Sequence, residues 1–169
     1  MPDNNATPHA AEPVAPDFAA YDRLARDQSR REDELRAANK TALFDALSAT
    51  PIHTVTVIFD GSGDSGQIES VEAWAPEAQA PGGQRLVDLP ATLITYIAPV
   101  WDSANIDTRQ STVREVIEAL CYALLEKTHD GWEIDDGAYG EFIFDVENRA
   151  ITLEHNERVM TSQYHAHEF

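Results

Sequence analysis

The stretch HTVTVIFD, residues 53–60, alternates apolar and polar side chains and constrains the fold of this chain more than any other feature. Val55, Val57 and Phe59 recur with a period of two, which is typical of a half-buried β-strand. The glycine-rich sequence DGSGDSG follows, and QIESVEAWA then has the pattern of a return strand. We therefore predict an antiparallel hairpin with DGSGDSG, residues 60–66, as its loop.

A second hairpin is indicated by GEFIFDV and AITLEHNE, residues 140–146 and 150–157. Alternation places five apolar side chains on its inward face: Phe142, Phe144, Val146, Ile151 and Leu153. The outward face carries Glu141, Ile143, Asp145, Thr152 and Glu154. Two hairpins predict an antiparallel sheet, and its apolar face requires a cover of helices.

A helix is predicted over TVREVIEALCYALLEKTHDG, residues 112–131. Thr112 and Glu115 have capping-box spacing, and Gly131 lies where a C-terminal stop is expected. The single cysteine, Cys121, falls on the apolar stripe, so we expect a buried thiol and no disulfide. The stretch ATLITYIAPVWD is a further strand or a short helix that ends at Pro99. The predicted fold class is α+β: an antiparallel sheet of four or five strands with helices packed on one face, plus an N-terminal helix.

The N-terminal part of the chain differs from the rest in composition. Residues 1–16 are rich in Pro, Ala and Asn and predict a disordered tail. Residues 17–50 predict a helical segment with a wholly polar middle, and residues 51–169 an acidic α+β domain. A continuous helix of this length would span about 50 Å, at about 1.5 Å per residue. Either it breaks near Asn39, or its first half projects and mediates self-association or partner docking.

The balance of charge limits the classes of partner. The chain has 30 acidic and 12 basic residues and a net charge of −18, and residues 51–169 carry 21 acidic and 6 basic residues. Such a field repels nucleic acid and anionic membranes, so we expect no direct binding to either, and it favours a protein with a basic surface. The sequence has neither a signal-peptide pattern nor an apolar run long enough to span a membrane, which predicts a cytoplasmic protein.

The segments GSGDSGQIE, LCYALLEKTHDGWEIDDGAYGEFIFDV and ITLEHNER, followed by a terminal HEF, together carry a resemblance. They resemble an uncharacterised family of small acidic bacterial proteins, a domain of unknown function, over roughly residues 52–169. The resemblance implies kinship but no activity, cofactor or catalytic residue.

The DGSGDSG loop contains fragments of two known motifs. The GDSG around Ser65 occurs in trypsin-like proteases, but only His9 and His53 precede this serine, so a catalytic triad lacks its parts. Asp60, Ser62 and Asp64 have the spacing of the first calcium ligands in an EF-hand loop, and Glu69 could add a carboxylate. We interpret the stretch as a hairpin turn and keep calcium binding as an alternative.

Histidines near the C-terminus raise a second metal alternative. His165 and His167 would lie on one side of a strand, and His155 on a neighbouring strand could join them in a zinc site. No spacing here matches a known zinc signature.

Carboxylates beside aromatic residues leave a third alternative, a small hydrolase. In DGWEIDDGAYGEF, Asp135 and Asp136 lie close to Trp132 and Tyr139, and paired carboxylates can hydrolyse glycosides. Nothing in the sequence places two of them at the required separation.

The density of acidic residues after Asp130 supports our leading hypothesis, which is that the chain binds a basic protein surface. The candidate interaction residues are Asp135, Asp136, Glu141, Asp145, Glu147 and Glu154. Carboxylates at strand spacing can imitate a nucleic-acid backbone and occupy a basic groove. We therefore expect a non-enzymatic interaction protein without a cofactor that binds a basic protein surface. One form of this hypothesis is a nucleic-acid mimic that inhibits a bacterial nucleic-acid-binding or defence protein, similar in composition to anti-CRISPR inhibitors.

Overall fold

The structure, a computed structural model, describes residues 18–100 and 105–169. Residues 1–17, which include the predicted tail, lie outside this range. The elements in chain order are α1 (Phe18–Ser48), β1 (Thr54–Ser62), β2 (Ser65–Pro76), a 3-10 turn (Pro81–Gly83), β3 (Gln84–Val87), β4 (Leu93–Pro99), β5 (Ile106–Thr112), α2 (Val113–Thr128), β6 (Ala138–Asp145) and β7 (Ala150–Glu157).

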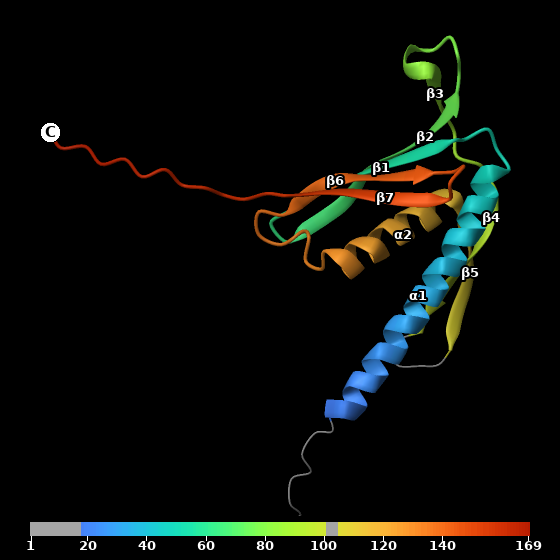
Figure 1. The fold of residues 1–169 in the computed structure, drawn as a ribbon, viewed down its shortest axis with the longest axis horizontal. Coiled ribbons are helices and arrows are strands. Elements are labelled where there is room, and N and C mark those ends of the chain that lie inside the picture. The colour runs from blue at the N-terminus through green and yellow to red at the C-terminus, as the bar shows by residue number, and fades with distance from the viewer. Residues whose placement is uncertain (1–17, 101–104) are drawn as a thin grey trace, which may run out of the picture.

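Five strands form the main sheet in the order β3-β2-β1-β6-β7, and all neighbours are antiparallel. Both helices lie on one side of this sheet, and the other side is open (Figure 1). The predicted α+β class and the helical cover on one face are therefore confirmed. The two predicted hairpins are β1-β2 and β6-β7, and they meet along β1 and β6.

The core lies between the sheet and the helices. It combines inward side chains of β1, β2 and β6 with one stripe of each helix: Val55, Val57, Phe59, Val71, Ala73, Phe142, Phe144, Leu43, Phe44, Leu47, Val113, Val116, Ile117, Leu120, Cys121 and Leu125. Burial of the Cys121 thiol is as predicted, and it raises the pKa of that group. Leu43, Phe44 and Leu47 belong to α1, so the last turns of that helix are part of the same core as the sheet.

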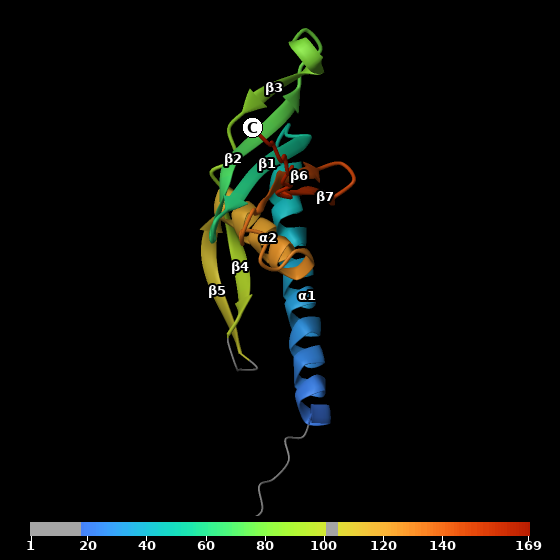
Figure 2. The same ribbon diagram turned by 90° about the vertical axis from the view of Figure 1, so that its left-hand side faces the viewer.

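The first part of α1 projects from the body, and the helix runs without a break past Asn39 (Figure 2). Residues 21–31 are exposed around the whole helix. Phe18, Tyr21 and Leu24 are 73%, 75% and 70% exposed. Of the two arrangements left open by the sequence, the projecting helix is the one observed.

Asn39 anchors the second sheet. The strands β4 and β5 pair only with each other, and β4 lies along α1. The Asn39 amide donates to the Ile97 carbonyl at 2.7 Å and accepts from the Ile97 N–H at 2.9 Å. A buried asparagine in the helix therefore satisfies both backbone groups of one residue in a strand.

The capping box of α2 forms as predicted. The Thr112 hydroxyl accepts from the backbone N–H of Glu115, and the Glu115 carboxylate accepts from the backbone N–H of Thr112. No helix in the described ranges is both long and apolar enough to cross a membrane.

The DGSGDSG loop is shorter than predicted. The strands continue to Ser62 and from Ser65, so that only Gly63 and Asp64 form the turn, with φ angles of 62° and 80°. Two consecutive residues with positive φ make the two-residue turn that matches the twist of a hairpin.

Candidate functional site

The tip of the first hairpin is bound to the loop that precedes β6. The backbone N–H of Gly63 donates to the Asp135 carbonyl at 2.9 Å, and that of Asp64 donates to the Glu133 carbonyl at 3.2 Å. The conspicuous sequences DGSGDSG and DGWEIDD therefore form one structural unit. Its backbone hydrogen bonds fix the loop between α2 and β6.

Trp132 fills the space beneath this unit, and glycines make the space available. An added Cβ would lie 2.6 Å from the indole at Gly61 and 2.2 Å from it at Gly66. The indole packs edge-on against Phe59, with ring centroids 5.4 Å apart and an interplanar angle of 89°. The close approach of an aromatic ring thus explains Gly61 and Gly66, whereas Gly63 is explained by its positive φ in the turn.

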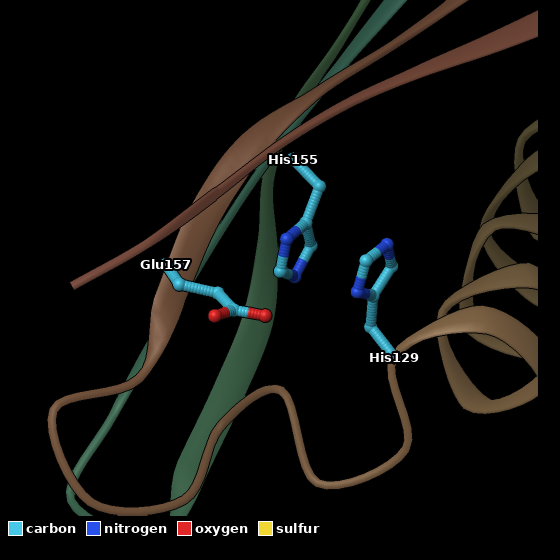
Figure 3. A group of neighbouring side chains, drawn as sticks. All are labelled: His129, His155 and Glu157. Carbon is cyan, nitrogen blue, oxygen red and sulfur yellow. The ribbon is translucent and has the colours of Figure 1, made fainter. Parts of the chain in front are cut away.

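The same loop begins at His129, the residue that follows α2, and brings it to the edge strand β7. His155 and Glu157 lie two residues apart on the inward face of β7, because they pair across the ladder with Gly140 and Ala138. We call His129, His155 and Glu157 the histidine cluster; Figure 3 shows their side chains converging on one space between α2 and β7. Their potential ligand atoms all lie within 4.8 Å of one another.

The histidine cluster contains an unsatisfied nitrogen. The two imidazoles are stacked, with centroids 3.6 Å apart and an interplanar angle of 6°. Nε2 of His155 is buried and has no hydrogen-bond partner. Burial lowers the pKa of His155, the neighbouring His129 lowers it further, and Glu157 raises it. Loss of solvent and the nearby His129 both disfavour the imidazolium form of His155, so the environment favours its neutral ring.

A pocket of about 350 Å³ opens beside the histidine cluster, and its lining includes Trp132, Asp136 and Arg158. Arg158 donates to the Asp60 carboxylate at 2.5 Å and lies 4.8 Å from the centre of the Tyr139 ring. The Asp136 carboxylate accepts from the backbone N–H of Met160 at 2.9 Å. These contacts hold the chain that leaves β7 against the rim of the pocket.

The residues of the predicted calcium loop are not brought together. Asp60 and Ser62 lie on β1, Asp64 lies in the turn, and Glu69 lies beside the bulge of β2. The Asp60 carboxylate is engaged by Arg158. Within residues 18–100 and 105–169, the histidine cluster is the one group of three His, Cys, Asp or Glu side chains with ligand atoms this close, and none of these loop residues belongs to it.

The structure separates Ser65 from His53, and His9 lies outside the described residues. Ser65 begins β2 at the hairpin tip, whereas His53 immediately precedes β1 at the opposite end of that nine-residue strand. A strand of this length spans about 30 Å at about 3.3 Å per residue.

The predicted zinc residues divide into two groups. His165 and His167 lie in the segment after β7, which has no helix or strand and extends away from the body (Figure 1). His155 instead meets His129 and Glu157. His155 and Glu157 share a strand face, which the sequence shows, but His129 follows a helix and only the tertiary fold brings it close.

Of the six candidate interaction residues, three share the open side of the main sheet. Glu141 and Glu154 are directly opposite each other on β6 and β7, and Asp145 lies on the same face of β6. Glu72 of β2 joins them, because it pairs with Thr56 on the open side of β1. We call Glu72, Glu141, Asp145 and Glu154 the acidic sheet face. The other three candidates lie off this face: Asp135 and Asp136 in the loop before β6, and Glu147 in the turn after it.

The strands of the main sheet carry many acidic residues and almost no basic ones. Arg85 of β3 is their one basic residue, and it lies 3.8 Å from Glu77. The carboxylates in these strands are Asp60, Glu69, Glu72, Glu141, Asp145, Glu154 and Glu157. Apolar groups are exposed among them, with Ile58 and Tyr139 each 45% and Leu86 57% exposed.

Fold and charge together define a small acidic α+β protein with one open sheet face. A model of the family of unknown function DUF6878 matches residues 35–169, and the chain belongs to this family. The match includes the part of α1 that packs in the core and omits residues 18–34, of which residues 21–31 are exposed. No match was found among curated proteins or among solved structures.

Proposed function

We propose that this protein is a non-enzymatic interaction protein whose acidic sheet face binds a basic surface of a partner protein. The observation that carries this proposal is the absence of any Lys or Arg from β1, β2, β6 and β7, next to the carboxylates of the acidic sheet face.

The pair Glu141 and Glu154 supports a role in binding. Their Cα atoms are paired directly across two antiparallel strands. Like charges in this arrangement are destabilising. A guanidinium or ammonium group placed between the two carboxylates would remove the repulsion. Binding of a basic partner would therefore relieve a destabilising contact of the isolated protein.

Apolar side chains on the same face favour a protein as the partner. Ile58 is paired with Glu141 and is 45% exposed, and Ile143 and Trp74 are half-buried on the same side. An interface with a protein commonly has apolar or aromatic contacts inside a polar rim. A binding face of this composition suits arginine-rich surfaces, because arginine pairs with carboxylates and also packs on aromatic rings.

The finer proposal is that the partner is a nucleic-acid-binding protein, and that the acidic sheet face occupies the groove that binds its nucleic acid. Carboxylates on a rigid sheet would then take the place of phosphates. Direct competition tests this point: addition of the protein should displace a labelled duplex from the partner, and formation of a ternary complex would contradict it.

The experiment begins with partners captured at low salt and then measures each purified partner against matched variants. Glu141→Gln combined with Glu154→Gln should weaken binding and reduce its salt dependence. Glu126→Gln combined with Glu168→Gln changes the net charge equally at exposed sites away from this face and should leave the affinity nearly unchanged. Equal losses for the two double variants, or affinity insensitive to salt, would refute the proposal.

Self-association through α1 is a second candidate, and it is favoured by the exposed stripe of Phe18, Tyr21 and Leu24. Three large apolar side chains at helical spacing on a projecting helix form a surface that a second copy can cover. Tyr21→Glu combined with Leu24→Glu should lower the sedimentation coefficient at high concentration. Arg23→Gln combined with Arg26→Gln, which makes the same change in net charge on the opposite side of the helix, should not. A wild-type chain that sediments as a monomer throughout would exclude this candidate.

A further inference from the structure

We propose that the histidine cluster is a binding site for a divalent transition-metal ion, with Zn²⁺ as the best chemical fit. The site is separate from the acidic sheet face, because His155 and Glu157 occupy the inward side of β7 and Glu154 the outward side. It therefore does not depend on the proposed interaction.

The donor set suits zinc. Two imidazole nitrogens and one carboxylate oxygen are ligands that Zn²⁺ takes at about 2.0–2.2 Å, and three protein ligands leave one coordination position open. Ca²⁺ and Mg²⁺ prefer sets made of oxygen alone, so two histidines disfavour them. The open position would face the adjacent pocket of about 350 Å³, which has room for water or a small ligand.

The unsatisfied Nε2 of His155 is a second, independent observation. It is buried without a hydrogen-bond partner. Such an atom destabilises the fold if nothing binds it, and native structures rarely keep one without a reason. A metal ion bound through this nitrogen would satisfy it, and the packing of the ring near Phe59, with centroids 6.0 Å apart, already limits its orientation.

One imidazole must turn to form the site. Donor atoms on one tetrahedral zinc ion lie about 3.3 Å apart for bonds of about 2.0 Å. In the cluster they lie within 4.8 Å of one another. One ion cannot lie in the planes of both imidazoles while these are stacked in parallel, so one ring must turn. His129 is the ring that turns most readily, because it follows the end of α2, whereas His155 is seated in the sheet.

The test uses the full chain. Titration calorimetry with zinc chloride should show one ion bound per chain, and Co²⁺ should give the visible absorption of a low-symmetry nitrogen and oxygen site. His129→Asn and Glu157→Gln should each weaken Zn²⁺ binding by about tenfold or more, because even loss of outer-shell partners costs about 10–100-fold. These two residues are partly or fully exposed, so both variants are expected to fold, which circular dichroism checks.

The control is the double variant His165→Asn and His167→Asn, which removes two histidines of the C-terminal segment. It should bind Zn²⁺ as the wild type does. Loss of binding in this variant, unchanged binding in both His129→Asn and Glu157→Gln, or the absence of heat and of a Co²⁺ spectrum for the wild type would each overturn the proposal.

Discussion

Replacement of Gly66 by alanine should displace the indole of Trp132 and destabilise the loop that carries His129. A Cβ at Gly66 would lie 2.2 Å from Cη2 of Trp132 and 2.7 Å from two further ring carbons. Carbon atoms normally approach to about 3.5–4.0 Å. The ring would therefore have to move by more than about 1 Å to restore a normal contact. Its edge-on contact with Phe59 opposes that movement.

Two opposing effects set the change that Gly66→Ala makes in the free energy of unfolding. Overpacking of a well-fitted site costs about 1–3 kcal/mol. Alanine in place of glycine within a strand otherwise gains about 0.5–1 kcal/mol, because the unfolded chain loses conformational freedom. We therefore expect Gly66→Ala to lower the free energy of unfolding by about 1–2 kcal/mol, measured by urea denaturation with an unchanged slope.

A double-mutant cycle with Trp132→Ala isolates the cause. In that background the added Cβ meets no ring, and Gly66→Ala should become neutral or stabilising by about 0.5–1 kcal/mol. The exposed neighbour Ser65→Ala should change stability by less than about 0.5 kcal/mol in either background. If Gly66→Ala costs the same with and without the indole, the steric explanation is wrong.

Three further predictions concern other parts of the fold. Asn39→Ala should cost about 2 kcal/mol of unfolding free energy by urea denaturation, since both backbone groups of Ile97 lose their partner, and a loss within error would contradict this role. Thr112→Ala should cost about 1 kcal/mol through loss of the helix cap, restored in large part by serine but not by valine. Asn148→Ala should raise the pKa of Asp145 in an NMR titration, because the Asn148 amide and then its backbone N–H hold that pKa down. The stability that this lowered pKa contributes is present above the unfolded-state value and is lost as the pH falls through the folded-state value, so the variant should lose less stability on acidification.

Much of the fold could be predicted because it follows from local periodicity. The alternation around Val57 and Phe144 identified two hairpins and their buried faces, and the spacing of Thr112 and Glu115 identified the start of α2. These patterns depend on residues within one strand or one turn of helix, so a single segment contains the whole signal.

The second sheet was only half predicted. The sequence of β4 was interpreted as a strand or a short helix, and IDTRQST, which forms β5, has no alternation of apolar residues. Its side chains are exposed from Ile106 to Gln110, so burial leaves no pattern in this strand. Pairing with β4, itself held by Asn39 of α1, decides that β5 forms.

The two candidate sites also differ in how far they could be predicted from local sequence. Three residues of the acidic sheet face, Glu141, Asp145 and Glu154, were predicted to share a face from the period of two along β6 and β7. The proximity of His129 to His155 was not predicted, because 25 residues lie between them in the sequence and neither belongs to a recognisable metal motif. The glycines of DGSGDSG likewise indicated a turn, whereas the packing of Gly61 and Gly66 against Trp132 could not be inferred.

The sequence by itself determined the acidic charge, the strands and helices with strong periodicity, and the side of each strongly periodic strand that faces the core. These properties depend on composition and on neighbours a few residues apart. Only the tertiary structure decided the strand order β3-β2-β1-β6-β7, the projection of α1 and the convergence of α2 with β7 on the histidine cluster. Such features depend on contacts between distant segments, and the free energy of those contacts is not contained in any one segment.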